Sequence, residues 1–258
     1  MDKTKLTFLG TCAADFSPRL KGEFAHRFDR DARRSSCMLI GESRLIDCGV
    51  HCAESLEIAG KDFAKITDIF ITHFHRDHFA PKCVERIVAG REKPLRLWCR
   101  RDAVLPEIPH TEVIRMEEGK RYALGDMTAE GMDANHDEAS FPQHYLFEIR
   151  GKKFLYACDG AWFLTRTYNR LKGAGLSLLV LDATCGDYAG DYRMAEHNSL
   201  PMIRLMLPSL KTAGIIGDAT EIYLSHIAPS LHLPHEQLCM LAAVDGLKVA
   251  YDGMEIFL

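Results

Sequence analysis

The sequence has neither the long apolar runs of a membrane protein nor the surplus of positive charge of a nucleic-acid-binding protein. No apolar stretch is long enough to span a bilayer, and residues 1–10 lack the extended apolar segment of a signal peptide. The 36 aspartates and glutamates outnumber the 32 lysines and arginines, which gives a net charge of −4. We therefore expect neither a membrane nor a nucleic acid as the partner of this chain.

The cysteines lack the C-x-x-C spacing of a metal knuckle or a redox pair. Their number, nine, is odd, and without a leader segment this favours free thiols in a reducing cytoplasm. Cys48 and Cys52 flank His51 in the segment CGVHC, but no second ligand pair accompanies them in the sequence. We therefore interpret these two cysteines as small buried residues rather than as a metal site.

The composition is that of a globular protein, because 47% of the 258 residues are hydrophobic and 26% are charged. The chain has no internal repeat and no low-complexity segment. We expect a single domain over residues 1–258, built from two β-rich halves at about 1–125 and 126–258.

Short β-like runs alternate with helical segments along the chain. The predicted strands are 6–10, 36–41, 43–49, 66–72, 95–99, 176–184 and 221–227. The predicted helices are 51–60, 80–90, 162–174 and 199–214, with another after Pro234. Residues 111–150 alternate as antiparallel hairpins do, and 247–257 is expected to form a closing hairpin. Two sheets packed face to face with helices on both outer faces, an α/β four-layer αββα sandwich, would bury these strands.

A dense group of metal-ligand side chains follows the apolar strand 66–72. The segment ITHFHRDHF contains His73, His75, Asp77 and His78. In an extended chain, alternation sends His73 and His75 to the same side, while Asp77 and His78 begin the turn into the next helix. Imidazole and carboxylate donors suit zinc, with iron or manganese as alternatives. Because the donors come from a strand end and from a bend, we predict two ions held side by side.

The segment THFHRDH resembles the T-H-x-H-x-D-H motif of the metallo-β-lactamase superfamily. The segments FLGTCAA near the start and LIDCG at 45–49 are similar to the opening strand and the L-I-D-x-G segment of that family. The resemblance implies the αββα fold and a supporting role for Asp47. It also implies two divalent metal ions, with zinc as the expected metal.

The same resemblance implies a full ligand set. The first ion would take His73, His75 and His136, the second would take Asp77, His78 and His226, and Asp159 would bridge them. His144 competes with His136, but its segment QHYLFEI has the pattern of a strand. Cys158 competes with Asp159 and is interpreted as a core residue. His232 and His235 are expected in a surface loop and at a helix start.

Residues 181–199 are similar to the phosphodiesterase branch of the family, which includes RNase Z and phosphoribosyl cyclic phosphodiesterase. In that branch His197 would contact the scissile phosphate or protonate the leaving oxygen, and Asp182 and Thr184 would support its loop. Arg33 and Arg34 could neutralise a phosphate, although such a charge run is equally typical of a solvated loop. The remaining candidates at the pocket mouth are Tyr188, Asp191, Tyr192 and Arg193.

These observations predict a cytoplasmic metal-dependent hydrolase acting on a small or cyclic phosphodiester, with Asp77, Asp159 and His197 as catalytic residues. The partner is a small-molecule substrate, and a homodimer is compatible with this prediction. The alternatives are a lactonase, thioesterase or other carboxyl-ester hydrolase on the same centre. A redox di-iron protein, a metal sensor and a nuclease are more distant alternatives.

Overall fold

The computed structural model describes residues 3–187 and 192–258 of the chain. In this part of the chain, fourteen strands form two sheets of seven. The first sheet, in spatial order, contains β14 (Met254–Phe257), β1 (Lys5–Gly10), β2 (Cys37–Ile40), β3 (Arg44–Ile46), β4 (Asp68–Phe70), β5 (Leu95–Arg100) and β6 (Thr111–Met116). The second contains β13 (Lys248–Val249), β12 (Glu221–Ser225), β11 (Leu178–Asp182), β10 (Lys152–Ala157), β9 (Gln143–Ile149), β8 (Met127–Asp133) and β7 (Arg121–Leu124).

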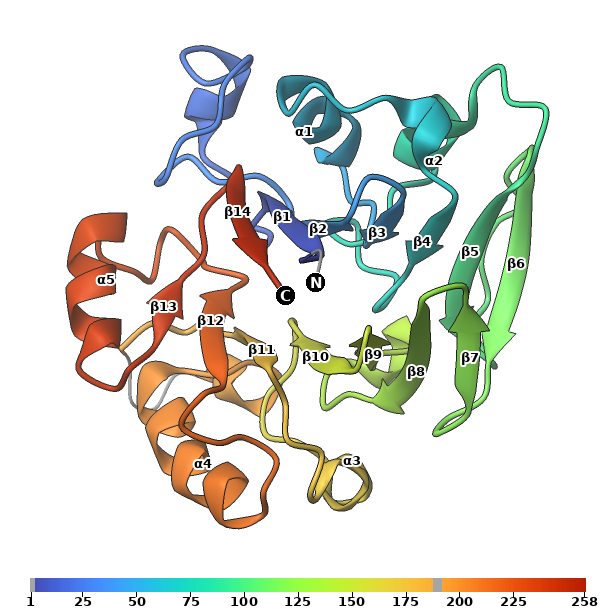
Figure 1. Cartoon of the computed structure of the whole chain (residues 1–258). Coiled ribbons are helices and arrows are strands. Elements are labelled where there is room, and N and C mark those ends of the chain that lie inside the picture. Colours follow the sequence, from blue (N-terminus) through green and yellow to red (C-terminus); the bar gives the residue numbers. More distant parts are fainter. Residues whose placement is uncertain (1–2, 188–191) are drawn as a thin grey trace.

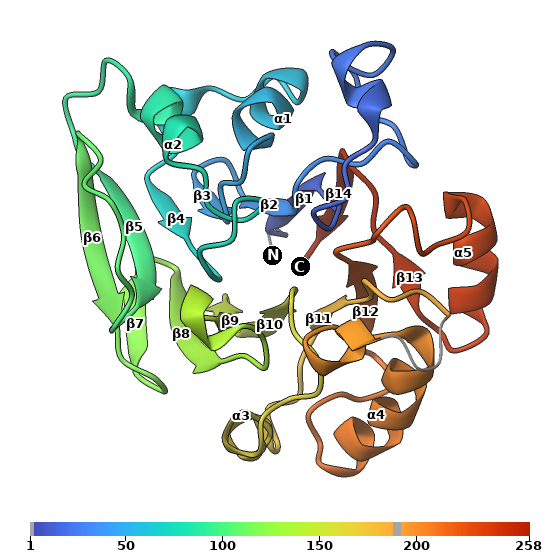
Figure 2. The same ribbon diagram turned by 180° about the vertical axis from the view of Figure 1, so that it is seen from behind.

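The helices lie on the outer faces of the two sheets. Figure 1 shows α1 (Cys52–Ile58) and α2 (Pro81–Val88) outside the first sheet. The reverse view in Figure 2 shows α3 (Thr165–Leu171), α4 (Leu200–Thr212) and α5 (His235–Ala243) outside the second. The predicted αββα sandwich is confirmed. None of the helices between residues 3 and 187 or 192 and 258 combines the length and hydrophobicity of a membrane span.

The sheets pack against each other through large side chains of their inner faces. Phe70 of β4 stacks on Trp98 of β5, with ring centroids 5.4 Å apart. It also meets the edge of Phe147, on β9 of the opposite sheet, at 5.1 Å. One further apolar layer lies between each sheet and its helices. Each strand of the interior is therefore buried on both faces, which explains the continuous apolar runs in the sequence.

The predicted closing hairpin at 247–257 is wrong. β13 pairs in parallel with β12 of the second sheet, whereas β14 pairs antiparallel with β1 of the first. The chain crosses between the sheets at Asp252 and Gly253, and the Gly253 amide donates to the carbonyl of Phe8 at 2.7 Å. The Asp-Gly turn signal occurs in hairpins and in crossings alike, so the free edges of the two sheets decide the pairing.

The strand predicted over 66–72 is shorter in the structure, where β4 ends at Phe70. His73 and His75 therefore lie beyond the strand, in the loop that leads to α2. The loop starts at the end of β4, next to the end of β3, because these two strands are parallel neighbours. Its position at the carboxyl edge of the sheet is the usual place for a ligand site in a sheet with parallel strands.

Candidate metal centre

The loop after β4 is held in a fixed shape by hydrogen bonds to the scaffold. The Thr72 amide and hydroxyl donate to the carboxylate of Asp47 at 2.7 and 2.9 Å. The amides of His78 and Phe79 both donate to the carbonyl of His75, which bends the chain between them. The bend places Asp77 and His78 beside His73 instead of carrying them away along a strand.

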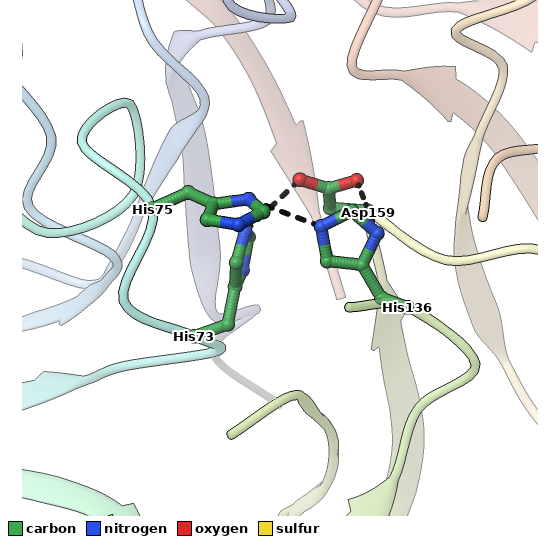
Figure 3. A group of neighbouring side chains, drawn as sticks. All are labelled: His73, His75, His136 and Asp159. Carbon is green, nitrogen blue, oxygen red and sulfur yellow. Dashed lines mark hydrogen bonds and ion pairs between the residues drawn. The ribbon is translucent and has the colours of Figure 1, made fainter. Parts of the chain in front are cut away.

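Two side chains from the first half of this loop and one from the loop after β8 gather around Asp159, as Figure 3 shows. Nε2 of His73 lies 3.1 Å from Oδ2 of Asp159. Nδ1 of His75 lies 3.1 Å from Nε2 of His136, which follows β8 in the loop to β9. Nδ1 of His136 is 3.5 Å from the other oxygen of Asp159. These four residues form the first group that could hold a metal ion.

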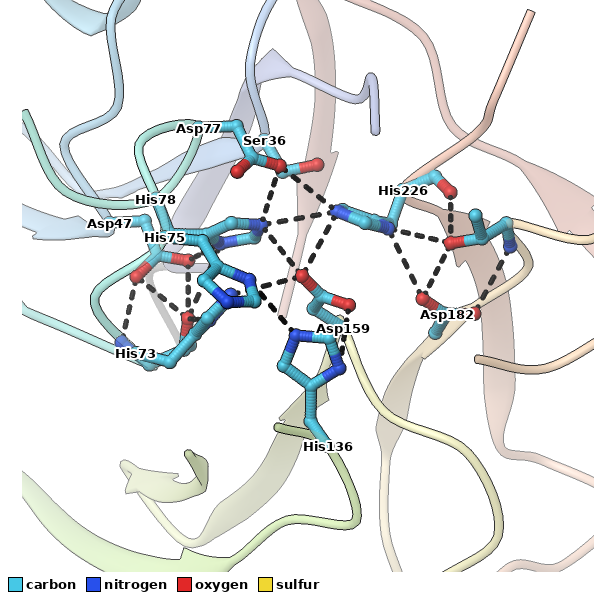
Figure 4. Close-up of polar contacts among 12 residues, drawn as sticks. Ser36, Asp47, His73, His75, Asp77, His78, His136, Asp159, Asp182 and His226 are labelled. Atoms are coloured by element: carbon cyan, nitrogen blue, oxygen red, sulfur yellow. Dashed lines mark hydrogen bonds and ion pairs between the residues drawn. The ribbon is translucent and has the colours of Figure 1, made fainter. Parts of the chain in front are cut away.

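A second group lies on the other side of Asp159 (Figure 4). Nε2 of His78 is 3.1 Å from Nε2 of His226 and 3.4 Å from Oδ2 of Asp77. Both imidazole Nε2 atoms lie 3.3 Å from Oδ2 of Asp159. Asp159 therefore belongs to both groups, and its carboxylate lies between them. The structure brings all seven candidate ligands into one site.

Two of the distant ligands lie directly beyond the ends of parallel strands. β10 and β12 both pair in parallel with β11, so Asp159 and His226 emerge at the same edge of the second sheet. Both residues have φ near +56°, in the left-handed region that non-glycine residues rarely adopt. This conformation turns each side chain out of its strand direction and toward the loop of the first sheet. Strained non-glycine backbone of this kind is typical of functional sites.

Buried carboxylates orient the second group. Oδ2 of Asp47 is 2.7 Å from Nδ1 of His78, which leaves Nε2 facing the cluster. Nδ1 of His226 lies 2.6 Å from the Thr184 hydroxyl, and that hydroxyl donates to Asp182 at 2.8 Å. A histidine whose second nitrogen is fixed in this way is the usual arrangement around a bound metal.

The site has buried polar atoms that the protein itself leaves unsatisfied. Nε2 of His73 and Oδ1 of Asp159 make no hydrogen bond of suitable geometry, although a carboxylate oxygen lies 3.1 Å from the first atom and an imidazole nitrogen of His197 lies 2.9 Å from the second. Burial lowers the pKa of His73 to about 3, so this imidazole is neutral and has a free lone pair. Neutral imidazoles and ionised carboxylates are the donors that zinc and related ions require. The residues present therefore fit the predicted metal ions.

Carboxylates at the site are held in their ionised form. Burial would raise the pKa of Asp77, but the charge of His78 and hydrogen bonds from His226 and His78 hold it well below its usual range. The pKa of Asp159 is likewise well below its usual range, since burial is outweighed by its electrostatic interactions with His226, His73 and His136. Conversely, Asp159 and hydrogen bonds to Asp182 and Asp77 raise the pKa of His226 to about 9 against the effect of burial. Without bound ions, protons on these histidines balance the carboxylates.

His197 joins the cluster from the loop before α4. Its Nδ1 lies 2.9 Å from Oδ1 of Asp159 and 3.2 Å from Oδ2 of Asp182. Burial opposes its charge, but Asp182 and Asp159 raise its pKa to about 11. With Nδ1 directed at these carboxylates, Nε2 is the nitrogen that can reach a ligand. The predicted support of this loop by Asp182 is seen also in the Asn198 amide, which donates to Asp182 at 2.8 Å.

The cluster opens into a small cavity of about 230 Å³. The cavity is lined by Ala13, Ala14, Asp15, His75, Asp77, His136, Asp159, Thr184, Arg193, Glu196, His197, His226 and Ala228. A larger hollow of about 670 Å³ lies over α1 and contains none of the candidate ligands. The candidate metal ligands therefore face the smaller cavity, and Arg193 lines the same cavity.

Arg33 and Arg34 are not in this cavity. The Arg33 guanidinium is buried and donates to the Thr11 hydroxyl and the Ala250 carbonyl, both at 2.6 Å. The fully buried Arg34 donates to the carbonyls of residues 24, 25 and 27. Both side chains serve the attachment of the N-terminal segment to the sheets, so neither is free to bind a phosphate.

The mouth of the cavity agrees with the prediction for Arg193 and differs from it for Tyr192. Tyr192 is 86% exposed and is not among the lining residues, whereas its neighbour Arg193 is. Tyr188 and Asp191 lie outside the described residues. Sequence reasoning missed Asp15 and Glu196 as lining residues. The sequence position of Asp15, shortly after the glycine turn that ends β1, could have indicated that Asp15 lies near the cavity.

The other residues that competed for a role as metal ligands lie outside the two ligand groups. His144 is buried within β9, against the ring of Phe163, and Cys158 belongs to the core between the sheets. His235 begins α5 as predicted, but it is buried beside Arg33 rather than exposed. His232 is half-buried and its Nε2 lies 2.5 Å from the Ala183 carbonyl.

Comparisons with known sequences relate parts of this chain to two groups of proteins. The family described as "Anti-Pycsar protein Apyc1" matches residues 5–85. The ribonuclease Z of Methanothermobacter thermautotrophicus is 33% identical over 97 residues, and that of Methanococcus maripaludis is 35% identical over 98. Each match covers 36% of this chain but only 28% of the ribonuclease.

Solved structures match over almost the entire chain. The metallo-β-lactamase fold protein YhfI from Bacillus subtilis has a TM-score of 0.76 and 16% identity, with both chains covered completely. PqqB from Methylobacterium extorquens has a TM-score of 0.69 and 14% identity, covering 98% of this chain and all of PqqB. The short form of human tRNase Z has a TM-score of 0.65 and 18% identity, covering 98% of both chains. These structures confirm the predicted fold, and the chain is a protein of the metallo-β-lactamase fold.

Proposed function

We propose that this chain is a hydrolase that uses two divalent metal ions to cleave a small or cyclic phosphodiester. The observation that carries the proposal is the position of Asp159, whose carboxylate belongs to both ligand groups at the base of the cavity. A shared carboxylate is typical of two-metal hydrolytic centres. Zinc is the expected metal, with manganese or iron as alternatives, because the donors are imidazoles and carboxylates.

The chain would hold each ion with its own set of side chains. The first ion would be bound by His73, His75 and His136, and the second by Asp77, His78 and His226, with Asp159 between them. When bound, the ions would supply the Lewis acidity that hydrolysis near neutral pH requires. Asp77 and Asp159 are ionised in the protein, so they contribute negative charge that two divalent cations would balance.

His197 would act on the leaving group. Asp182 and Asp159 keep its imidazole protonated, and Nδ1 faces these carboxylates. Nε2 can therefore donate its proton to the oxygen that leaves when the phosphorus–oxygen bond breaks. Arg193 lines the same cavity and would favour an anionic substrate over a neutral one.

One observation favours a phosphodiester over other substrates, and two favour a small substrate over a nucleic acid. The curated relatives are ribonucleases, which cleave phosphodiester bonds, and they share 33% and 35% identity with this chain over the matched part. The cavity of about 230 Å³ suits a small or cyclic substrate better than a folded RNA. The acidic net charge also disfavours a nucleic-acid substrate.

The test is a hydrolysis screen with metal-defined protein. Cyclic nucleotides, cyclic sugar phosphates and bis-aryl phosphates would be compared with aryl esters, lactones and thioesters. We expect turnover of a phosphodiester. Asp77→Ala and His226→Ala should each lose nearly all of this activity and one metal ion per chain. His110→Asn, a change at an exposed histidine outside the cavity, is the matched control.

Preferential turnover of a carboxyl ester or thioester would contradict the phosphodiesterase function. It would favour the alternative function, a carboxyl-ester or thioester hydrolase on the same metal centre. Unchanged metal content in both variants would overturn the ligand assignment itself. An RNA substrate would be recognised by binding that weakens steeply with salt concentration.

A further inference from the structure

Four cysteines from separate segments meet in the core between the first sheet and its helices. Cys37 begins β2, Cys48 follows β3, Cys52 begins α1, and Cys83 lies in the first turn of α2. All four side chains are buried, with at most 7% of their surface exposed. The sequence alone offered only the Cys48–Cys52 pair, without the second pair that a metal site needs.

Three of the sulfur atoms are close enough for one ion to contact them together, and the fourth lies next to one of the three. The Sγ atoms of Cys48, Cys52 and Cys83 all lie within 4.8 Å of one another. The Sγ atom of Cys37 lies 3.2 Å from that of Cys52. Sulfur ligands on a tetrahedral zinc ion are separated by roughly 3.8 Å, because each zinc–sulfur bond is about 2.3 Å long. Small side-chain adjustments would therefore complete the coordination of one ion.

One backbone amide is placed to stabilise a thiolate in this group. The Ala53 amide donates a hydrogen bond to Sγ of Cys83 at 3.2 Å. The Cys37 sulfur lies 3.2 Å from the Asp47 carbonyl, a contact that needs a thiol proton and that metal binding would release. The four cysteines belong to an apolar cluster of the core, in which a bound ion would be shielded from water.

We propose that Cys48, Cys52 and Cys83, with Cys37 as the fourth ligand, bind one thiophilic d10 cation, zinc in the first instance. Each cysteine loses its proton to solvent as the ion binds, and no oxidant or reductant takes part. The site is separate from the centre around Asp159, which has only nitrogen and oxygen donors. Because the cysteines are buried, the ion enters while the chain folds.

Such an ion would join the segments that support the loop after β4. The Cys48 amide donates to the His78 carbonyl at 2.8 Å, and the Ala80 amide donates to the Cys48 carbonyl at 2.9 Å. Cys48 also directly follows Asp47, which orients His78. A thiolate-bound ion at this place would therefore be structural, and it would stabilise the scaffold of the catalytic loop without contacting the substrate.

The test uses cadmium as a spectroscopic probe. The full chain is refolded under reducing conditions with cadmium, and absorption from sulfur-to-cadmium charge transfer is recorded. We expect this band in the unaltered protein and in Asp77→Ala and His226→Ala, since histidine and carboxylate ligands do not produce it. The band thus reports the cysteine site even if the proposed hydrolytic centre is wrong.

Cys83→Ser and Cys48→Ser should lose the band, one metal ion per chain and several degrees of Tm. Cys99→Ser is the matched control, because Cys99 is fully buried in the same apolar layer but outside the group. No charge-transfer band in the refolded unaltered protein would overturn the proposal, and this measurement does not depend on whether the variants fold. A disulfide between Cys37 and Cys52 in the purified protein, detected by thiol counting, would also overturn it.

Discussion

Nδ1 of His78 lies 2.7 Å from Oδ2 of Asp47, and both side chains are completely buried. The same carboxylate accepts hydrogen bonds from the amide and hydroxyl of Thr72. Asp47 thus fixes at once the ring of one proposed ligand and the start of the loop that carries four. Its φ of 65° shows that the backbone accepts an unfavourable conformation to place it there.

Removing the charge of Asp47 should weaken metal binding without removing a ligand. We expect Asp47→Asn to lower the affinity of the second ion by about 10- to 100-fold, the usual cost of losing a carboxylate behind a metal-bound histidine. Competition with a chromogenic chelator measures the affinity. Asp68→Asn is the matched control, because Asp68 is also fully buried but bonds Trp98 and Arg96 away from the site. Equal affinity losses in both variants would argue against a specific role for Asp47.

Because Asp159 belongs to both ligand groups, its substitution should affect metal content differently from the substitution of a ligand that belongs to one group. Asp159→Asn should lower the occupancy of both ions, whereas Asp77→Ala should lower only that of the second. Elemental analysis of protein dialysed against a metal buffer gives the two stoichiometries. If Asp159→Asn loses a single ion, Asp159 is not a bridging ligand.

The proposed role of His197 makes activity depend on the leaving group. We expect His197→Gln to slow hydrolysis of an alkyl phosphodiester by about 100- to 10,000-fold, the usual range for general acid catalysis. A substrate that releases nitrophenolate needs little protonation and should be affected much less. Parallel kcat measurements on the two substrates test this, with metal content as the control. Equal losses on both substrates would mean that His197 binds the phosphate rather than donating a proton.

The histidine pKa values predict how the stability of chelated protein depends on pH. The pKa of His226 is raised from 6.5 to about 9, so its contribution is complete below pH 6.5 and is lost as pH rises through 9. The neighbouring carboxylates cause this rise. At about 1.4 kcal/mol per pKa unit, the loss of unfolding free energy for His226 is at most about 4 kcal/mol.

His197, with its pKa near 11, contributes in the same direction at higher pH. The pKa of His73 is lowered to about 3, so its contribution changes only below pH 6.5. Urea unfolding of chelated protein between pH 6.5 and 10 should therefore show falling stability. Saturating zinc should remove or reverse the trend, because metal binding requires deprotonated histidines. A flat profile in the chelated protein would contradict the assigned proton positions.

Gly49 is needed because the backbone of the ligand loop passes directly over it. A Cβ atom at this position would lie 1.8 Å from the carbonyl oxygen of Asp77. Gly49→Ala should therefore displace Asp77, lower the occupancy of the second ion and reduce Tm. Gly217→Ala is the control, since a Cβ there meets no atom within 4 Å. Normal metal content in Gly49→Ala would show that the loop can move without cost.

The dense segment from His73 to His78 was readable from the sequence because its ligands are local. Six consecutive residues supply four donors, so their proximity does not depend on the rest of the fold. His136, Asp159 and His226 could be named only through the resemblance to a known family, because nothing in their own segments states which loop they face. The parallel pairing of β10, β11 and β12 brings two of them to the same edge.

The prediction that Arg33 and Arg34 bind the substrate is wrong for a physical reason. A charge run in a sequence is normally solvated, yet here Thr11, the Ala250 carbonyl and the N-terminal segment supply hydrogen bonds that make burial acceptable. These partners lie up to 217 residues away in the sequence, so no local pattern reveals them. The same long-range pairing separated β13 from β14 where the Asp-Gly signal predicted a hairpin.

The sequence by itself determined the layered architecture and the chemical type of the main site, because periodic apolar runs and clustered ligands are local properties. Only the tertiary structure decided that Cys37 and Cys83 stand beside Cys48 and Cys52, or that His197 shares its carboxylates with the candidate metal ligands. Such neighbours depend on strand order and helix placement, which are set by burial of the entire chain and not by the segments that meet.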